Sequence, residues 1–154
     1  MLTIKKLSNN LIGCAGEYFV AGELSRHGIV AALTMAGTDA FDILAINPES
    51  KNNYSIQVKT TKKRSDGWLV GRKAETLCGD DLYYAFVLLP DNDDAQPEYY
   101  IVPSEIVSRT VQAEHRAWLE TPGRGGRPHQ DNSIRVFRIE HGDPRYCSRW
   151  DYFK

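Results

Sequence analysis

Four side chains within the first 60 residues have types suited to metal-assisted chemistry on a phosphate group. Gln57 and Lys59 stand two positions apart in the β-rich run YSIQVKTT, so both project from one face of the expected strand. Asp42 lies fifteen residues upstream in GTDAFDILAIN, and Glu17 precedes it in a helical run. Two acids, an amide and a lysine in this order indicate a divalent metal site with a lysine beside it.

Hydrolysis of a phosphodiester requires a cation that neutralises charge on the phosphate and activates water, and Mg²⁺ or Mn²⁺ takes oxygen ligands for this work. The predicted ligands are the side-chain oxygens of Glu17, Asp42 and Gln57 and the backbone carbonyl of Val58. Lys59 is predicted to orient the attacking water or to stabilise charge that develops on the phosphate. Gln57 is neutral, so it lowers the expected metal affinity relative to an acid at that position.

Local patterns predict the elements that position these residues. Apolar residues at helical spacing predict a helix over 9–27, which carries Glu17. Short β-rich runs separated by Gly, Pro and Asn predict three strands in a meander. These strands cover 29–33, 41–46 and 54–60.

Sequence patterns in the second half of the chain predict a sheet that is covered on both faces and a further helix. The continuous apolar run 82–89 is typical of a strand buried on both faces. A strand over 99–102 leads into a helix that starts at 103 and runs toward Trp118. Shorter strands are expected at 68–71 and 134–139, and the Gly- and Arg-rich segment 121–133 is expected to be a loop.

The segments GEYFVAGELSRHG, GTDAFDILAIN and YSIQVKTT resemble the PD-(D/E)XK nuclease superfamily, and DDLYYAFVLL and YYIVPSEIV support the likeness. The QxK variant is similar to that of small prokaryotic members, including group I intron homing endonucleases. Gln57 departs from the superfamily pattern by replacing an acid, and Phe41 departs from it by replacing a Pro. The resemblance implies an α/β, restriction endonuclease-like core of αβββαβ type, a mixed central sheet flanked by helices. It also implies a single nuclease-like domain over 1–154.

The same resemblance implies a metal-dependent DNA endonuclease in which Glu17, Asp42, Gln57 and Lys59 occupy the catalytic positions and Mg²⁺ or Mn²⁺ is the cofactor. A chain of this size that cuts both DNA strands is expected to act as a homo-oligomer, a dimer or a tetramer. The alternative is a catalytically weak or inactive nuclease-fold protein that binds nucleic acid or another protein.

The charged residues are unevenly distributed, although the net charge is only -1. Seven basic residues and one acid lie between 51 and 73, whereas 80–105 holds seven acids and no base. Basic residues near a metal site attract a nucleic-acid backbone, and a solvated loop is the alternative for each of them. The residues expected to contact DNA are Lys62, Lys63, Arg64, Arg72, Lys73, Arg124 and Arg127.

His129 and Asn132 hint at a ββα-metal nuclease, but no second His or Cys set supports it.

The remaining composition favours a cytoplasmic protein that does not enter a membrane. The three cysteines are far apart and match neither a disulfide framework nor a zinc spacing. No continuous apolar signal region opens the chain, and no stretch approaches the ~18 apolar residues that span a bilayer.

Overall fold

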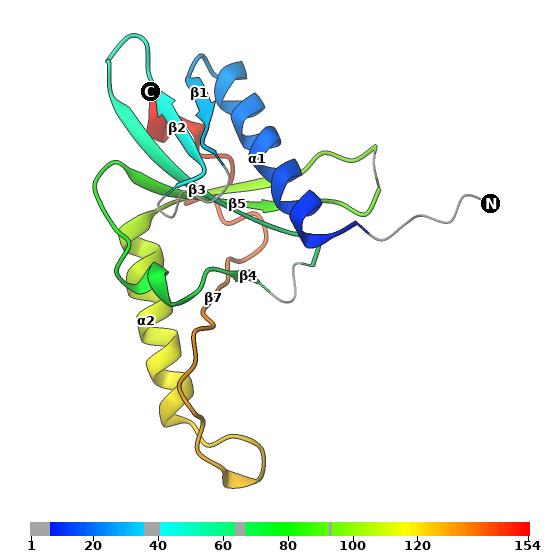
Figure 1. The fold of residues 1–154 in the computed structure, drawn as a ribbon, viewed down its shortest axis with the longest axis vertical. Helices are drawn as coiled ribbons and strands as arrows, with labels where there is room; N and C mark the ends of the chain where they lie inside the picture. The colour runs from blue at the N-terminus through cyan, green and yellow to red at the C-terminus, as the bar shows by residue number, and fades with distance from the viewer. Residues whose placement is uncertain (1–6, 36–40, 64–66, 93) are drawn as a thin grey trace, which may run out of the picture.

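The computed structural model describes residues 7–35, 41–63, 67–92 and 94–154. The first half of the chain contains one long helix followed by strands: α1 (Asn9–Arg26), β1 (Val30–Leu33), β2 (Ile43–Ile46), β3 (Asn53–Thr61) and β4 (Trp68–Leu69). The second half contains η2 (Arg72–Glu75), β5 (Leu82–Leu88), β6 (Glu98–Pro103), α2 (Ser104–Glu120), η3 (Arg124–Gly126), β7 (Val136–Phe137) and η4 (Trp150–Phe153). Figure 1 shows their arrangement.

Five of the described strands form the central sheet, in the order β1-β2-β3-β5-β6. β1, β2 and β3 pair antiparallel as the predicted meander, β5 joins β3 in parallel, and β6 returns antiparallel to β5. This mixed sheet with helices on both sides confirms the predicted α/β fold class. Between β3 and β5, where the superfamily pattern has a helix, the described residues form the short strand β4 and the short 3₁₀ helix η2.

The two faces of the sheet bury two separate cores. On one face, Val20 and Leu24 of α1 pack against Ile56 and Val58 of β3, and Phe153 of the C-terminal segment closes this core. Phe19 of α1 is 44% exposed, because the buried side of the helix follows Gly16, Val20 and Leu24.

The opposite face of the sheet is covered by α2. Val107 and Val111 of this helix pack with Tyr84 and Phe86 of β5. In the parallel register, Gln57 lies beside Tyr84 and Lys59 lies beside Phe86. Gln57 and Lys59 therefore project from the face on which α2 lies, as the two-residue alternation predicts.

Helix α1 begins and ends at residues suited to those positions. The side chain of Ser8 accepts a hydrogen bond from the N–H of Leu11 at 3.3 Å, which caps the first turn. Gly28, with φ of 83°, follows the last turn and takes the left-handed conformation that ends many helices. No helix in the described ranges is both long enough and apolar enough to cross a bilayer, and the three cysteines form no disulfide.

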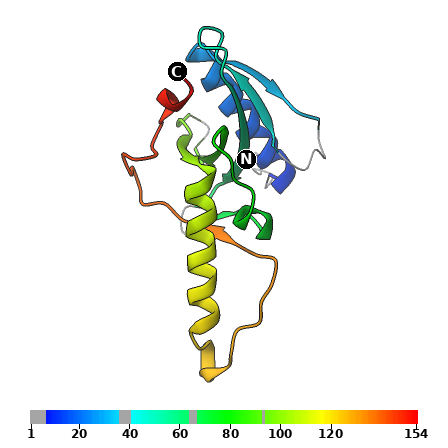
Figure 2. The same ribbon diagram turned by 90° about the vertical axis from the view of Figure 1, so that its left-hand side faces the viewer.

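The distal half of α2 and the segment that returns from it project away from the sheet (Figures 1 and 2). We call residues 112–135 the arm. Its return path ends in β7, which pairs with β4 rather than with the central sheet. The predicted strand over 134–139 is thus only two residues long, and the predicted loop 121–133 forms the end of the arm.

Candidate metal and phosphodiester site

Asp42 lies immediately before β2, at the point where that strand begins to pair with β3. Its backbone N–H donates to the carbonyl of Ile56 at 2.9 Å, and its own carbonyl accepts from the N–H of Thr34 at 2.9 Å. These bonds hold Asp42 between the end of β1 and the middle of β3. The sheet therefore fixes the backbone of Asp42.

The carboxylate of Asp42 reaches across to β3. Its Oδ2 accepts one hydrogen bond from the side-chain amide of Gln57 at 2.6 Å and another from the backbone N–H of Val58 at 2.7 Å. Strand β2 starts only at Ile43, so Val58 of β3 has no paired residue in β2. The carboxylate of Asp42 accepts the hydrogen bond from the N–H of Val58 in place of a backbone carbonyl. The N–H and C=O of one strand residue point to the same side, so the carbonyl of Val58 also faces this edge.

Glu17 of α1 is half-buried and is electrostatically coupled to the same site. Burial raises the pKa of its carboxyl group, the negative charge of Asp42 raises that pKa further, and the positive charge of Lys59 opposes both effects. Within the described ranges, Glu17 and Lys59 form no ion pair or hydrogen bond. Three charged groups therefore act on one another here without direct contact.

The donor set suits a hard divalent cation. Two carboxylates, an amide oxygen and a backbone carbonyl are all oxygen ligands, the kind that Mg²⁺ and Mn²⁺ prefer. Oδ1 of Asp42 accepts no hydrogen bond from the described residues. Among the described residues, no three His, Cys, Asp or Glu side chains are grouped so that they could hold a metal ion. At position 57, where the superfamily pattern has an acid, this chain has the neutral Gln57. The residues fit a cation held through two carboxylates rather than three.

Tyr84 is a neighbour of the site that the sequence did not indicate. It lies beside Gln57 in the register of β3 and β5, is 1% exposed, and stacks on Phe86 with ring centroids 5.6 Å apart. Burial raises the pKa of its hydroxyl to about 12, with smaller contributions from Asp42 and Cys78. Within an apolar run, nothing local distinguishes this tyrosine from an ordinary core residue.

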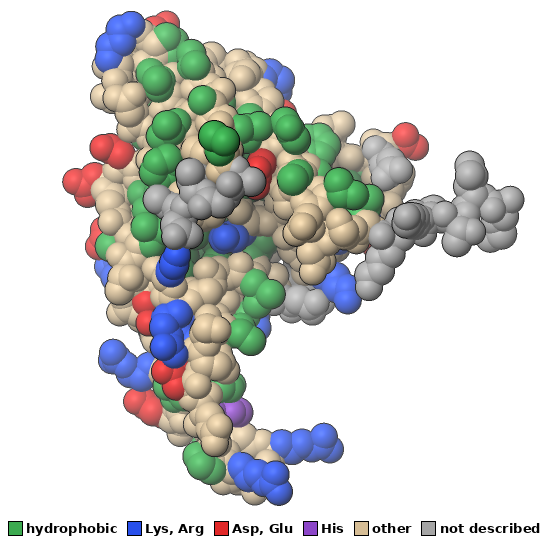
Figure 3. All heavy atoms as spheres, viewed as in Figure 1, with side chains coloured by type: hydrophobic (Ala, Val, Ile, Leu, Met, Phe, Trp, Pro, Cys, Tyr) green, Lys and Arg blue, Asp and Glu red, His purple; other side chains and the backbone are tan. Residues whose placement is uncertain are grey.

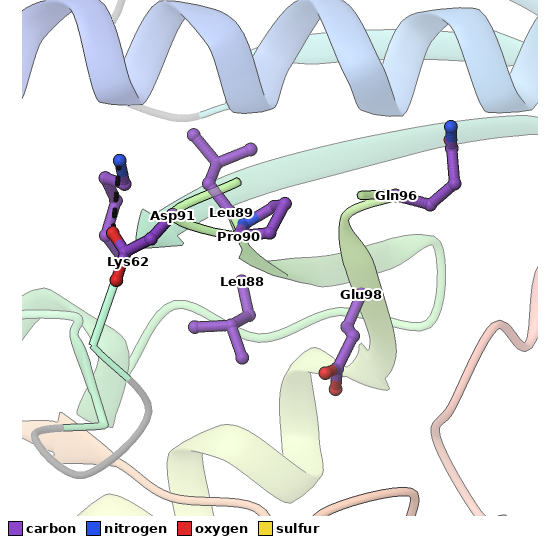
Figure 4. A pocket seen from close by; sticks show the side chains of 7 residues that line it. All are labelled: Lys62, Leu88, Leu89, Pro90, Asp91, Gln96 and Glu98. Carbon is purple, nitrogen blue, oxygen red and sulfur yellow. Dashed lines mark ion pairs between the residues drawn. The ribbon is translucent and has the colours of Figure 1, made fainter. Parts of the chain in front are cut away.

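The predicted DNA-contacting residues occupy different environments. Lys62 forms an ion pair with Asp91 at 3.3 Å on the rim of a hollow of about 150 Å³, and Figure 4 shows the two side chains facing each other at one end of it. Arg72 is bound to Asp131 at 2.9 Å and so braces the arm. Lys63 and Lys73 are exposed. Arg64 lies outside the described residues.

Arg124 and Arg127 lie at the end of the arm, where Figure 3 shows Lys or Arg side chains projecting. Both are exposed, and neither forms an ion pair with the described residues. His129, considered above as a metal ligand, instead stacks on Trp118 with ring centroids 4.0 Å apart. The arm thus presents two uncompensated positive charges far from the sheet.

No family model matches the chain, and no curated protein matches it in sequence. The solved structures that are similar to it include the following two. A bacterial homing endonuclease has 12% identity over 66% of this chain and 70% of its own, with a TM-score of 0.47. Hjc, a Holliday junction resolvase from the archaeal hyperthermophile Archaeoglobus fulgidus, has 17% identity over 87% of this chain and 88% of its own, with a TM-score of 0.49. At these values the functional inference depends on the geometry of the site.

Proposed function

We propose that the protein is a divalent-metal-dependent DNA endonuclease. The observation that carries the proposal is the carboxylate of Asp42, which accepts hydrogen bonds from both Gln57 and Val58. Residues fifteen and sixteen positions apart thereby converge at one edge of the sheet. The order of these residue types resembles that of PD-(D/E)XK nucleases, and it implies DNA as the substrate.

Asp42 is proposed as the central metal ligand, with Glu17, Gln57 and the carbonyl of Val58 completing the set. A bound Mg²⁺ or Mn²⁺ supplies positive charge to the phosphate and lowers the pKa of a water ligand. Lys59 keeps its ammonium beside the reacting phosphate, where its N–H groups orient the water and stabilise the developing negative charge. The water oxygen bonds to phosphorus and gives up a proton to solvent, while the bond from phosphorus to one ester oxygen breaks and that oxygen leaves with the electron pair and takes up a proton from solvent.

The arm extends the proposed DNA surface. The arm continues helix α2, which begins directly after Pro103, the last residue of β6. Pro103 pairs with Tyr83 of β5, and β5 pairs with β3, the strand that carries Gln57. The helix therefore starts two strands away from Gln57. The 17 residues of α2 span about 25 Å at ~1.5 Å per residue. Successive phosphates of one DNA strand are ~3.4 Å apart along the helix axis. Arg124 and Arg127 are therefore proposed to contact phosphates about 7 base pairs from the cleaved bond. Lys62, Lys63, Arg64 and Lys73 are proposed to contact the backbone nearer to the site.

We further propose that residues 1–154 act as one nuclease-like domain that forms a homodimer. One site of this kind hydrolyses one strand, so cleavage of a duplex calls for two sites related by a two-fold axis. Sedimentation equilibrium of the purified protein, with and without a duplex, tests this assembly. A monomer in both samples contradicts it.

The central experiment is metal-dependent nicking of supercoiled plasmid and of branched DNA. Wild-type protein is compared with Asp42→Asn and Lys59→Ala, while Glu49→Ala and Lys51→Ala serve as controls in the exposed turn between β2 and β3. Asp42→Asn keeps an oxygen that accepts from the N–H of Val58, so it removes the charge with little loss of structure. We expect each site variant to lose about 10²–10³-fold in rate and the controls to retain the wild-type rate.

Within the described ranges, no third acid joins Glu17 and Asp42 at the candidate site, and this favours the alternative of a nuclease-fold protein that binds without cutting. The same samples distinguish the two functions. Cleavage that survives both site substitutions rejects the assignment of Asp42 and Lys59. DNA binding that requires no metal, with no cleavage by the wild type under either cation, supports the alternative.

A further inference from the structure

Helix α1 packs tightly against β3 at Gly16. This glycine is buried, and a Cβ atom built on it overlaps Oγ1 of Thr60 and lies 2.9 Å from Cβ and 3.0 Å from Cγ2 of that residue. Carbon atoms in contact are ordinarily ~3.5–4.0 Å apart. Any side chain at position 16 therefore forces the helix and the strand apart.

The other glycines of α1 do not have this role. A Cβ on Gly13 or Gly22 meets nothing within 4 Å. Glycine is a poorer helix former than alanine at every interior position, so these two offer no packing reason for their presence. Gly13 therefore provides a matched control for Gly16 in the same helix, one turn away.

Thr60 carries a second unusual feature at the same contact. Its Oγ1 is buried and has no hydrogen-bond partner, and it is the only side-chain atom of this kind in the part of the chain that the structure describes. A buried hydroxyl without a partner is unfavourable and calls for an explanation. Such departures from good packing are expected where a functional arrangement sets the geometry.

Both residues adjoin the candidate site. Gly16 precedes Glu17 on α1, and Thr60 follows Lys59 on β3. Because side chains alternate along a strand, Thr60 faces the helix while Lys59 faces the opposite side of the sheet. The distance between α1 and β3 at this contact thus determines how far the carboxylate of Glu17 lies from Asp42 and Lys59.

We infer that Gly16 and Thr60 are positioning residues, which bring α1 close enough to β3 for Glu17 to share one cation with Asp42. The inference depends on the metal site of the proposed function. Separating the carbons to an ordinary contact distance moves Glu17 outward by about 0.5–1 Å. A displacement of this size at a catalytic centre lowers a rate by about 10²-fold.

The test compares Gly16→Ala, Thr60→Ala, the double variant Gly16→Ala/Thr60→Ala and the control Gly13→Ala. Binding of Mn²⁺ to the DNA-free protein is measured by electron paramagnetic resonance. We expect Gly16→Ala to bind Mn²⁺ at least ~10-fold more weakly than the wild type, and the nicking kcat to fall with the KM for DNA unchanged. The double variant is expected to recover part of the affinity, because removing Oγ1 and Cγ2 of Thr60 relieves two of the three close contacts and leaves the one with Cβ. Gly13→Ala is expected to match the wild type.

Crystal structures of the wild type and of Gly16→Ala provide a readout that does not depend on metal. The inference predicts that α1 moves away from β3 near Glu17 and returns partway in the double variant. An unmoved helix overturns the positioning role, as does unchanged Mn²⁺ affinity in Gly16→Ala when the wild type binds the ion. A wild type that binds no Mn²⁺ contradicts the proposed function, and the position of the helix still decides the role of Gly16.

Discussion

Asp42 combines two roles at the scale of single residues. Its Oδ2 substitutes for a backbone acceptor at the edge of the sheet, and its Oδ1 accepts no hydrogen bond from the described residues. The structural role fixes the carboxylate before any ligand binds, and pre-organised ligands lose less freedom on binding. Gln57 contributes to this fixed geometry through a donated hydrogen bond, which an acid at that position cannot provide.

Replacing Gln57 with Glu separates the hydrogen bond that Gln57 donates to Asp42 from the contact that position 57 is proposed to make with the cation. The variant puts a second carboxylate where an amide donates to Asp42 at 2.6 Å. Without metal, we expect the free energy of unfolding to fall by about 1.5–3 kcal/mol, because a hydrogen bond to a charged group is lost and like charges meet. With Mg²⁺, the added ligand charge is expected to strengthen binding by about tenfold, or ~1.4 kcal/mol.

Thermal unfolding of Gln57→Glu with and without 10 mM Mg²⁺ measures both effects, and Gln130→Glu on the exposed arm is the control. We expect a lower Tm than the wild type without metal and a larger rise in Tm on adding metal. If adding Mg²⁺ raises the Tm of Gln57→Glu and of the wild type equally, position 57 does not contact the cation.

Glu17 makes stability depend on pH. Its raised pKa means that the folded protein holds this proton more tightly than the unfolded chain does. Stability is therefore lost as pH increases from the ordinary carboxyl pKa through the raised one. In metal-free buffer, we expect Glu17→Gln to have a higher Tm than the wild type at pH 8 and the same Tm at pH 3.5. A variant that is less stable than the wild type at pH 8 contradicts the direction of the shift.

At the scale of elements, the base of the arm is organised around the buried side chain of Arg135. It donates to Oε1 of Glu75 in η2 and to the carbonyls of Asn132 and Ile134 at 2.7 and 2.8 Å. Asp131, in turn, contacts both Arg72 and Nε2 of His115 at 2.9 and 2.8 Å. The ion pairs of Arg135 with Glu75 and of Asp131 with Arg72 therefore help to attach the arm to the body of the protein.

Breaking this attachment is expected to loosen the arm alone. Arg135 is 4% exposed, and removing one partner of a buried ion pair costs about 3 kcal/mol because the other partner is left without compensation. We expect Arg135→Met to speed hydrogen exchange across 112–135 while the amides of β3 exchange at the wild-type rate. Arg138→Met is the control, because its contact with Glu114 is 3.9 Å long and exposed. Uniformly faster exchange across the chain means that Arg135 stabilises the whole fold.

At the scale of the whole molecule, the arm continues the helix α2, which packs on one face of the sheet. Gln57 and Lys59 share that face with α2, whereas Glu17 approaches from the other side of the sheet. Under the proposed function, we expect a duplex whose phosphate lies at Lys59 to pass beside the arm. The end of the arm can add contacts that depend on charge and on duplex length rather than on base sequence.

Arg124→Ala/Arg127→Ala tests this geometry through the salt dependence of binding. Each phosphate contact contributes ~0.9 to the slope of log K against log salt, so the double variant is expected to lower the slope by about 1.8. The loss should appear with a 30-base-pair duplex and vanish when fewer than about 7 base pairs flank the site. Arg26→Ala, on the far side of α1 and paired with Glu23, is the control. An unchanged slope with the long duplex excludes phosphate contacts at the arm.

The sequence by itself determined the elements and the residue types. Helical and alternating patterns depend on neighbours a few positions apart, so α1, the meander and the shared face of Gln57 and Lys59 followed from them, with strand limits shifted by one or two residues. Asp42 was placed at the start of its strand for the same reason. No local pattern distinguishes Arg72, which braces the arm, from an arginine that is free to contact a phosphate.

Only the tertiary structure decided how these elements meet. The hydrogen bonds from Gln57 and Val58 to Asp42, the position of Tyr84 and the pairing of β7 with β4 depend on strand register. The close approach of Gly16 to Thr60 depends on how two distant segments pack. Register and approach distance arise from interactions between residues far apart in the chain, and local periodicity contains no information about them.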